Sequence, residues 1–500
     1  PLRAAALACP VLALYIYEDE LLGAPDADAR HLGFLNEALD DLDAGLHGIG
    51  LRLLRLRGAL PEVFDALHRR QRIDILWSHE ETGNASSFAR DRAVAAWCRE
   101  QGVPWREFPN GAVVRRLRDR DDWSAHWMSV MRPAPAGPPP RITPARLAGI
   151  MSVVPPDAAA LGLPSRDIEG RQRAGRASAL HELDRFLDER VLRYRRGMSS
   201  PLSAGDDCSR LSPHLALGIV SLREAVHAVW RARSSWLAHA HVPQGAAALA
   251  GLKSFESRLH WHCHFMQKLE SEPGIEFRPV NRLYEGLREA DFSAARHAAW
   301  CRGETGYPFS DACMRSLHAT GWINFRMRAM LIAFSSYQLW NHWREPALHL
   351  ARLFTDYEPG IHYPQVQMQS GVTGINTLRI YNPVKQQIDQ DPKGIFVRRW
   401  LPELARVPLE LLAEPWRMTP DEQMRAGCLI GRDYPAPVVE HLAAARAARD
   451  AVWAVRRLPE AAAEARRVFV QHGSRNPDRE GVKRRRKAKA DDGGQMGFGF

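Results

Sequence analysis

Short apolar runs alternate with stretches of helical periodicity over residues 1–125. The run VLALYIY has no alternating polar positions, which is typical of a parallel strand covered on both faces. Strand followed by helix, repeated along the chain, predicts a doubly wound α/β domain. The predicted strands are 11–17, 51–56, 73–77 and 103–108, and the predicted helices are 32–46 and 84–100.

The pattern changes twice after the α/β domain. Residues 126–175 contain the stretches MRPAPAGPPPRITP and VVPPDAAALGLP, whose Pro, Gly and Ala content predicts an inter-domain linker. From 176 to 470 helical patterns dominate, with turns at Pro and Gly, so we predict an all-α domain. Residues 471–500 are polar and basic, and we predict a disordered tail there.

Charge and hydropathy limit the classes of partner. The chain has 68 Lys and Arg against 58 Asp and Glu, a net charge of +10. This excess permits a polyanionic partner such as DNA, although a general bias toward Arg and Ala explains it equally well. No apolar run approaches the roughly 18 residues that a membrane helix needs. We therefore expect no membrane partner.

Cysteine and histidine spacing disfavours a metal centre. The seven cysteines are scattered without a C-x-x-C pair, so we expect reduced thiols, a cytoplasmic protein and no iron–sulfur cluster. His260, His262 and His264 are two residues apart, which distributes them around a helix instead of gathering them on one face. We therefore predict no metal site.

The segment CSRLSPHL precedes an apolar stretch predicted to be a helix over residues 216–230. Ser209 and Ser212 supply hydroxyls, and the partly positive helix N-terminus suits a pyrophosphate. Pro213 is tolerated in a first helical turn because its missing N–H would have no partner there. An ordinary helix cap is the alternative interpretation.

The order of motifs over residues 305–404 is distinctive. TGYPFSDACMRSLHATGWINFRMRAM is followed by DYEP, then LRIYNP, then RRWLPEL. This order resembles the flavin-binding half of the DNA photolyase/cryptochrome family. The resemblance implies a photolyase-like fold, with an α/β domain followed by an all-α FAD-binding domain, and it implies FAD and blue light. Family members open with a strand ending in an Arg-, Asp- and Leu-rich motif. This sequence begins just after that place, so we expect the α/β domain to lack a strand.

The resemblance also implies that Arg328 and Asp356 pair near the flavin ring. A buried guanidinium and a buried carboxylate satisfy each other and can stabilise charge on a ligand beside them. The alternative is a salt bridge in the core without a ligand.

The resemblance implies further flavin-binding residues. Cys208 stands where the family usually has Thr, His262 replaces an Arg, and Glu358 replaces a second Asp. Arg258 stands where family members often place a Glu that contacts damaged bases. The implied cofactor-binding residues are Tyr194, Cys208, Ser209, Arg210, Leu211, Ser212, Phe255, Arg258, His262, Arg328, Asp356, Glu358 and His362.

Three residues take catalytic roles by the same resemblance. Trp261 matches the Trp that stacks on the substrate, and Trp343 matches the middle member of the electron-transferring Trp chain. His362 matches the residue facing flavin N5, where it can donate a proton or hydrogen bond. A register shift of one residue would place Tyr363 there instead.

The Trp chain is interrupted in this sequence. Its proximal position holds Val366 and its distal position holds about Ala290. Core packing explains any single aromatic residue, but several together offer another route for electrons. These are Trp322, Trp340, Tyr357, Tyr363 and Trp400.

Three functions follow from the resemblance. The first is light-driven repair of a pyrimidine photoproduct by electron transfer from reduced FAD, with damaged DNA as substrate. The second is a signalling cryptochrome that binds FAD and repairs nothing, and the third is a light-independent flavin scaffold. Trp261 favours repair, whereas Arg258, Phe325 and the interrupted Trp chain favour signalling.

Two further regions carry predictions. The loop HEETGN at 79–84 follows a predicted strand, where α/β domains bind ligands. The position of the family's folate-binding Glu holds Ser87, which disfavours a folate antenna and leaves a deazaflavin or no antenna open. At the other end, the basic run KRRRKAK would strengthen contact with DNA. The final QMGFGF, residues 495–500, resembles peptides that bind the bacterial sliding clamp.

Overall fold

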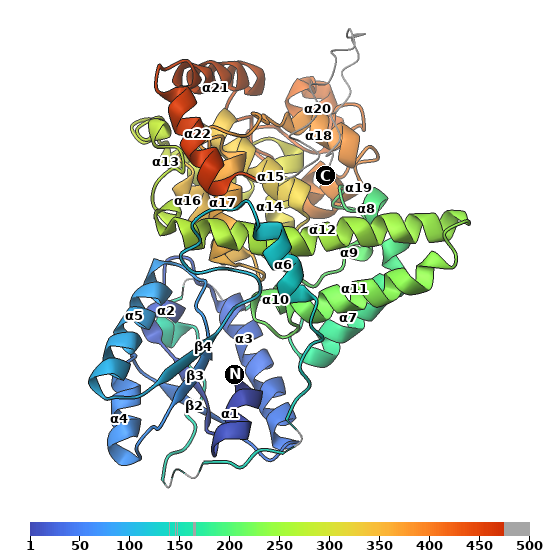
Figure 1. Cartoon of the computed structure of the whole chain (residues 1–500). Coiled ribbons are helices and arrows are strands. Elements are labelled where there is room, and N and C mark those ends of the chain that lie inside the picture. The colour runs from blue at the N-terminus through green and yellow to red at the C-terminus, as the bar shows by residue number, and fades with distance from the viewer. Residues whose placement is uncertain (140, 146, 148, 164–166, 475–500) are drawn as a thin grey trace.

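The computed structural model describes residues 1–139, 141–145, 147, 149–163 and 167–474. An N-terminal α/β part lies against a larger helical part, as the sequence predicts (Figure 1). The basic run and the proposed clamp-binding peptide at 495–500 lie outside the described residues.

Four short parallel strands form the centre of the α/β part. β1 (Ala13–Tyr17) pairs with β2 (Leu53–Arg57), with Ala13 opposite Leu53. β3 (Leu76–His79) pairs with β4 (Trp105–Phe108), with Leu76 opposite Trp105. Each strand lies within three residues of its predicted bounds. In the described part of the chain, the two pairs form separate two-stranded sheets.

Helices cover both faces of these strands, as expected for a doubly wound domain. Side chains of β1 alternate, so that Tyr15 and Tyr17 join the core under α1 and α3, and Leu14 and Ile16 join the core under α4 and α5. The helices of this part are α1 (Leu2–Ala8), α2 (Asp19–Leu22), α3 (Ala29–His47), α4 (Glu62–Arg70) and α5 (Ala85–Glu100).

The region predicted to be a linker runs along the α/β part before the chain enters the helical part. Val153 N–H donates to the carbonyl of Arg55 at 2.8 Å, beside β2. The boundary predicted at 125/126 lies inside α6 (Trp123–Met131), which packs on α12 through Trp123 and Trp127 against His260, each ring pair 5.0 Å apart.

The helical part contains one large core and one smaller core. Its α-helices are α7 (Arg176–Asp188), α8 (Tyr194–Gly197), α9 (Ala204–Asp207), α10 (Ser212–Ala216), α11 (Leu222–Leu237), α12 (Pro243–Ser271), α13 (Ala294–Arg302), α14 (Pro308–Thr320), α15 (Phe325–Ala333), α16 (Arg344–Leu353), α17 (Pro359–Gln369), α18 (Pro383–Gln390), α19 (Ile395–Trp400), α20 (Pro420–Ala426), α21 (His441–Arg456) and α22 (Ala461–His472). The short turns are η1 (Ala159–Leu161), η2 (Arg190–Leu192), η3 (Pro273–Glu276), η4 (Arg282–Tyr284), the π-helical η5 (Phe334–Gln338), η6 (Pro402–Leu404) and η7 (Pro415–Arg417).

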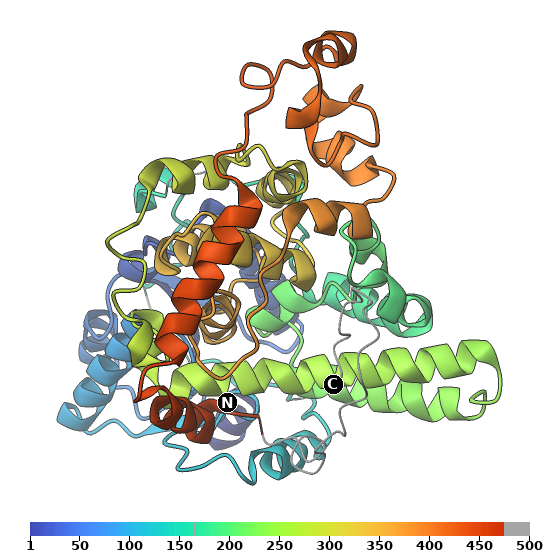
Figure 2. The same cartoon turned by 90° about the horizontal axis from the view of Figure 1, so that it is seen from above.

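The predicted helix over residues 216–230 is wrong at its start. The five-residue α10 ends at Ala216, and Gly218 turns the chain with a φ of +66°. Ser221 and Glu224 then form a capping box that starts α11. α11 and α12 form a helical hairpin that projects from the body, as Figures 1 and 2 both show.

Three features of the described residues relate to the predictions about cysteines, membrane helices and metal sites. All seven cysteines are free thiols. Among the described helices, none has the length and apolar character needed to cross a membrane. The described residues contain no group of three or more His, Cys, Asp or Glu side chains suited to a metal ion. At the C-terminal end, α22 continues to His472, two residues into the predicted tail.

Candidate functional site

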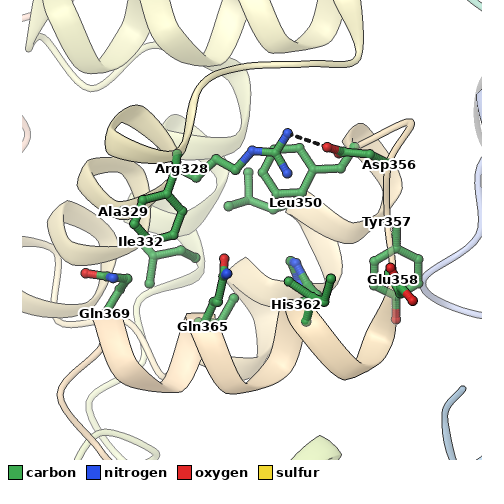
Figure 3. A pocket seen from close by; sticks show the side chains of 14 residues that line it. Arg328, Ala329, Ile332, Leu350, Asp356, Tyr357, Glu358, His362, Gln365 and Gln369 are labelled. Carbon is green, nitrogen blue, oxygen red and sulfur yellow. Dashed lines mark hydrogen bonds and ion pairs between the residues drawn. The ribbon is translucent and has the colours of Figure 1, made fainter. Parts of the chain in front are cut away.

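A cavity lies between α15, α16 and α17. We call it the first cavity (Figure 3). Helix α17 faces it because its inward residues recur every three or four positions, at Glu358, His362, Gln365 and Gln369. The full lining is Phe325, Arg328, Ala329, Ile332, Leu350, Phe354, Asp356, Tyr357, Glu358, Ile361, His362, Gln365, Val366 and Gln369.

The predicted pair of Arg328 and Asp356 forms at one end of the first cavity. Arg328 Nη2 lies 2.8 Å from Asp356 Oδ2, and the Asp356 side chain is 4% exposed. Arg328 Nε donates to the carbonyl of Ile323 at 2.8 Å, and its guanidinium lies 4.0 Å from the ring centroid of Phe354. These contacts fix the orientation of the guanidinium before any ligand binds.

Two buried polar atoms of the first cavity have no hydrogen-bond partner among the described residues. They are Asp356 Oδ1 and Gln369 Nε2. A buried polar group without a partner costs about 1–3 kcal/mol. This arrangement therefore suits a ligand that offers both a donor and an acceptor.

His362 projects into the first cavity, as Figure 3 shows. Its Nε2 lies 2.9 Å from the carbonyl of Ala347. A carbonyl only accepts, so we assign the hydrogen to Nε2 and the lone pair to Nδ1. Burial lowers the pKa of His362 to about 4, so the ring is neutral near pH 7. His362 can accept a hydrogen bond at Nδ1, which differs from the donor role predicted for it.

A register shift of one residue would put Tyr363 in the position predicted for His362, and the structure shows where both side chains lie. Tyr363 is fully buried, and its ring centroid lies 5.5 Å from that of His362. The lining of the first cavity contains His362 and does not contain Tyr363. His362 therefore lines the first cavity and Tyr363 does not, and which of the two faces flavin N5 stays a prediction.

His262 and Glu358 form a second ionic contact at this end of α17. His262 Nε2 lies 3.0 Å from Glu358 Oε2. Burial is the largest single influence and lowers the pKa of His262, but the charge of Glu358 and hydrogen bonds to Cys263 and Glu358 together raise it to about 10. His262 therefore keeps a positive charge next to Glu358 near neutral pH.

This contact should make stability depend on pH. The folded pKa of His262 is raised, so its contribution is fully present below about pH 6.5 and is lost as pH rises through about 10. Between these values, the free energy of unfolding should fall by at most about 1.4 kcal/mol per pH unit. Urea titrations of the wild type and Glu358→Gln at pH 7 and 9 measure this contribution. The free energy of unfolding of the variant should fall less between these pH values than that of the wild type.

The matched control is Glu403→Gln. It breaks an Arg315–Glu403 pair of 2.8 Å, in which the arginine does not titrate in this range. Its stability should change with pH as the wild type does. Equal pH dependence in the wild type and Glu358→Gln would contradict the assignment of a charged His262.

The loop at 208–212 lies beside the first cavity. Arg210 has a φ of +58°, which is strained for a residue with a Cβ. Its guanidinium lies 3.9 Å from the ring centroid of Trp322, whose Nε1 donates to Ser212 Oγ at 3.3 Å. Among the described residues, no carboxylate pairs with Arg210, and burial lowers its pKa to about 10 although Asp356 opposes that shift. A largely buried cation without a paired anion suits a phosphate ligand.

The other predicted cofactor residues lie away from the first cavity. Tyr194 and Phe255 are buried with Leu211 in the smaller core, with the rings of Tyr194 and Phe255 6.2 Å apart. Arg258 lies near the phenol of Tyr194. Burial raises the pKa of Cys208 to about 12, so its thiol is neutral.

The remaining catalytic candidates are also separate from the lining of the first cavity. Trp343 is buried at 1% exposure and precedes α16. Trp261 is half-buried on α12, and its ring centroid lies 4.8 Å from that of His264. The structure therefore gathers Arg328, Asp356, Glu358 and His362, and it places Trp261 and Trp343 outside that group.

A second cavity lies between the α/β part and the helical part. The loop predicted to bind a ligand contributes Glu81, Gly83 and Asn84, and Ser87 also lines the cavity. Helix α3 contributes His31 from the opposite side. The loop at 79–84, which follows β3 and precedes α5, thus lines a cavity, as its position between a strand and a helix predicts.

Comparison with known proteins places these features in a family. A deoxyribodipyrimidine photo-lyase of Streptomyces griseus is 31% identical over 484 residues, which cover 89% of this chain and 94% of that protein. This chain belongs to the DNA photolyase/cryptochrome family. The family model described as the FAD binding domain of DNA photolyase matches residues 255–454, and the DNA photolyase model matches residues 1–122.

The relatives in this family include both functional branches. A cryptochrome DASH of Gloeobacter violaceus is 29% identical, covering 89% of this chain and 90% of its own length. The crystal structure of a class III photolyase from Agrobacterium tumefaciens has a TM-score of 0.75 at 25% identity, covering 90% of this chain and 93% of that chain. The fold is therefore the photolyase fold, and the chain carries an FAD-binding domain.

The first cavity has polar groups that fit the family cofactor. Asp356 Oδ1 and Gln369 Nε2 of its lining are buried without partners among the described residues. Arg210 does not line the cavity, but it is a largely buried cation that lies close enough to Asp356 for that charge to act on its pKa. FAD has ring donors and acceptors and a pyrophosphate, which are the complementary groups.

Sequence reasoning missed several residues of these cavities. Gln365 and Gln369 are recoverable from helical spacing, since they lie three and seven residues after His362. Asp26, which lines the second cavity and bonds to Tyr357, carries no local signal in the sequence.

Proposed function

We propose that the protein is an FAD-dependent, blue-light-driven DNA photolyase that repairs pyrimidine photoproducts by electron transfer from reduced flavin. The observation that supports it best is the first cavity, in which Arg328 and Asp356 pair at 2.8 Å while Asp356 Oδ1 stays unpartnered among the described residues. A fixed cation beside a buried acceptor can hold a reduced, negatively charged ring.

Each residue of the site has a role in this proposal. Arg328 stabilises negative charge on the ring, and Asp356 fixes Arg328 and accepts a hydrogen bond at Oδ1. His362 accepts at Nδ1, and Arg210 holds the pyrophosphate. Bound FAD supplies the light absorption and the electron. Phe325, Ile332, Leu350 and Phe354 exclude water from the ring.

Recognition of DNA is assigned to the half-buried Trp261, which can stack on a base. We predict that Trp261→Ala keeps FAD but binds lesion-bearing DNA about 5- to 150-fold more weakly, because base stacking on an aromatic ring is worth about 1–3 kcal/mol. Fluorescence anisotropy with defined lesion-bearing and undamaged oligonucleotides measures this change. Trp453→Ala, at an exposed residue on α21, is a control that should bind as the wild type does.

The proposal is tested with photoreduced protein and two oligonucleotides, one with a cyclobutane dimer and one with a (6-4) photoproduct. Repair of either under blue light, and none in the dark, is the expected result. Equal affinity of Trp261→Ala and wild type for the lesion, with no repair, would contradict the proposal.

A cryptochrome-type photoreceptor without repair activity is the second candidate. Two residues of the first cavity support it. Phe325 offers no hydrogen bond to a lesion, and Val366 stands at the proximal position of the interrupted Trp chain. FAD binding and photoreduction without repair of either lesion would favour this candidate.

We also propose that the second cavity binds an antenna chromophore. Its position between the two parts and at the ends of β1 and β3 supports this role. Ser87 lines it where a folate-binding Glu would stand, so a deazaflavin fits the proposal better than a folate.

A further inference from the structure

Tyr357 lies in the wall between the two cavities. It lines the first cavity and also the second cavity, which no other described residue does. In the DYEP loop before α17 it follows Asp356, whose side chain pairs with Arg328. Figure 3 shows Tyr357 beside Glu358 at the end of the first cavity.

The phenol of Tyr357 is bonded to a carboxylate from the α/β part. Tyr357 Oη donates to Asp26 Oδ2 at 2.5 Å, across 331 residues of sequence. Asp26 is 6% exposed, and its Oδ2 also accepts from Asn84 Nδ2 at 3.2 Å. Burial, and then the negative charge of Asp26, raise the pKa of Tyr357 well above its usual value. The phenol is therefore protonated and aligned with a base.

Two imidazoles contact the Tyr357 ring. His31 stacks on it with centroids 6.0 Å apart at an angle of 23°, and His362 meets it edge-on at 5.3 Å. Burial lowers the pKa of His31 and lowers that of His362 to about 4. Both neighbours are therefore neutral near pH 7 and do not oppose the loss of an electron from the ring.

We propose that Tyr357 is a redox-active residue that reduces the photoexcited flavin of the first cavity by one electron while its phenolic proton moves to Asp26 Oδ2. The O–H bond of Tyr357 breaks and an O–H bond forms on Asp26. The tyrosine is oxidised to a neutral radical and the flavin is reduced by one electron. This inference rests on the proposed function, which supplies the flavin as oxidant.

The other aromatic candidates lack this combination. Trp343 does not line either cavity, and its Nε1 is buried with no partner among the described residues. Trp340 Nε1 donates to Asp291 Oδ2 at 3.3 Å, but Trp340 lines neither cavity. Trp322 lies under the guanidinium of Arg210, which makes its oxidation unfavourable.

The test illuminates the full-length, FAD-loaded protein without an external reductant. Flavin bleaching and the electron paramagnetic resonance spectrum of frozen, illuminated samples are recorded for the wild type, Tyr357→Phe, Asp26→Asn and Tyr284→Phe. We expect a tyrosyl radical and a solvent isotope effect on bleaching in the wild type. Tyr357→Phe should lose the tyrosyl radical signal, and its rate of flavin bleaching should fall by about tenfold or more.

The variants at the base and at a second buried phenol separate the chemistry of Tyr357 from the packing of a buried tyrosine. Asp26→Asn keeps a hydrogen-bond acceptor but removes the base, so bleaching should slow and the isotope effect should change. Tyr284→Phe is the matched control, because Tyr284 is buried, its phenol has no partner among the described residues, and it lines neither cavity. It should behave as the wild type does. A Tyr357→Phe protein that keeps the radical and the bleaching rate overturns the inference.

Wild-type protein with ring-deuterated tyrosine keeps the test decisive if a variant fails to fold. Narrowing of the radical spectrum supports a tyrosine, and an unchanged spectrum overturns the inference. Failure of the proposed function is distinct, because it appears as wild-type protein that binds no FAD or that repairs neither lesion once its flavin is reduced. FAD-loaded wild-type protein that does not bleach overturns the inference. A wild type that bleaches with a tryptophan radical overturns the inference alone.

Discussion

Replacing Asp356 with alanine is expected to give protein that is mostly colourless and less stable than the wild type. The change leaves Arg328 without its carboxylate partner at 2.8 Å and removes the acceptor Oδ1 from the first cavity. Breaking a buried ion pair costs about 3–5 kcal/mol. The Arg328 side chain keeps 21% exposure, so we expect a smaller loss, about 2–4 kcal/mol.

Flavin absorbance per protein and urea unfolding measure the two parts of this prediction. Asp356→Asn should retain more FAD than the alanine variant, because its amide still offers an oxygen acceptor. Glu403→Gln breaks an ion pair outside the first cavity and should stay yellow. Asp356→Ala protein with full FAD occupancy would show that the flavin site lies elsewhere.

Much of the fold is readable from the sequence because apolar runs and helical periodicity are local signals. The run VLALYIY predicts β1 because its residues must be buried on both faces of a parallel strand. The break between α10 and α11 was missed, although a glycine and the capping box of Ser221 and Glu224 mark it. An apolar stretch that continues through a turn hides such a break.

The site is less readable because its contacts join distant segments. Arg328 and Asp356 are 28 residues apart, and their pairing was predicted from the order of motifs that resembles a family. Asp26 and Tyr357 are 331 residues apart, and no local pattern relates them. The acceptor role of His362 depends on the carbonyl of Ala347, which only the folded chain places beside it.

One substitution that departs from the family pattern keeps its electrostatic function. His262 stands where the resemblance predicts an arginine, and a solvent-exposed histidine would be largely neutral at pH 7. Burial lowers the pKa of His262, but the charge of Glu358 and hydrogen bonds to Cys263 and Glu358 together raise it to about 10, so the contact stays ionic. The sequence shows the substitution, and the structure shows that its charge is retained.

Replacing Asp311 with alanine is expected to destabilise the helical part more than any other change considered above. Asp311 is fully buried under the TGYP turn and accepts from Thr305 N at 2.9 Å, Thr305 Oγ1 at 2.6 Å, Gly306 N at 3.0 Å and Tyr434 Oη at 2.6 Å. Each buried donor without an acceptor costs about 1–3 kcal/mol, and water entering the space can satisfy some of them. We expect a loss of about 4–6 kcal/mol.

Urea unfolding followed by circular dichroism measures this loss, and limited proteolysis locates it. The Tyr434 bond joins α14 to a segment 123 residues later, and Val438 N–H also donates to the carbonyl of Thr305 at 3.0 Å. Cleavage should therefore appear first between α20 and α21. Asp311→Asn keeps one acceptor oxygen, so its free energy of unfolding should fall less than that of the alanine variant. Asp389→Ala removes only a surface pair with Lys385, and its free energy of unfolding should fall by under about 0.5 kcal/mol. An Asp311→Ala protein as stable as Asp389→Ala would show that the turn does not depend on this carboxylate.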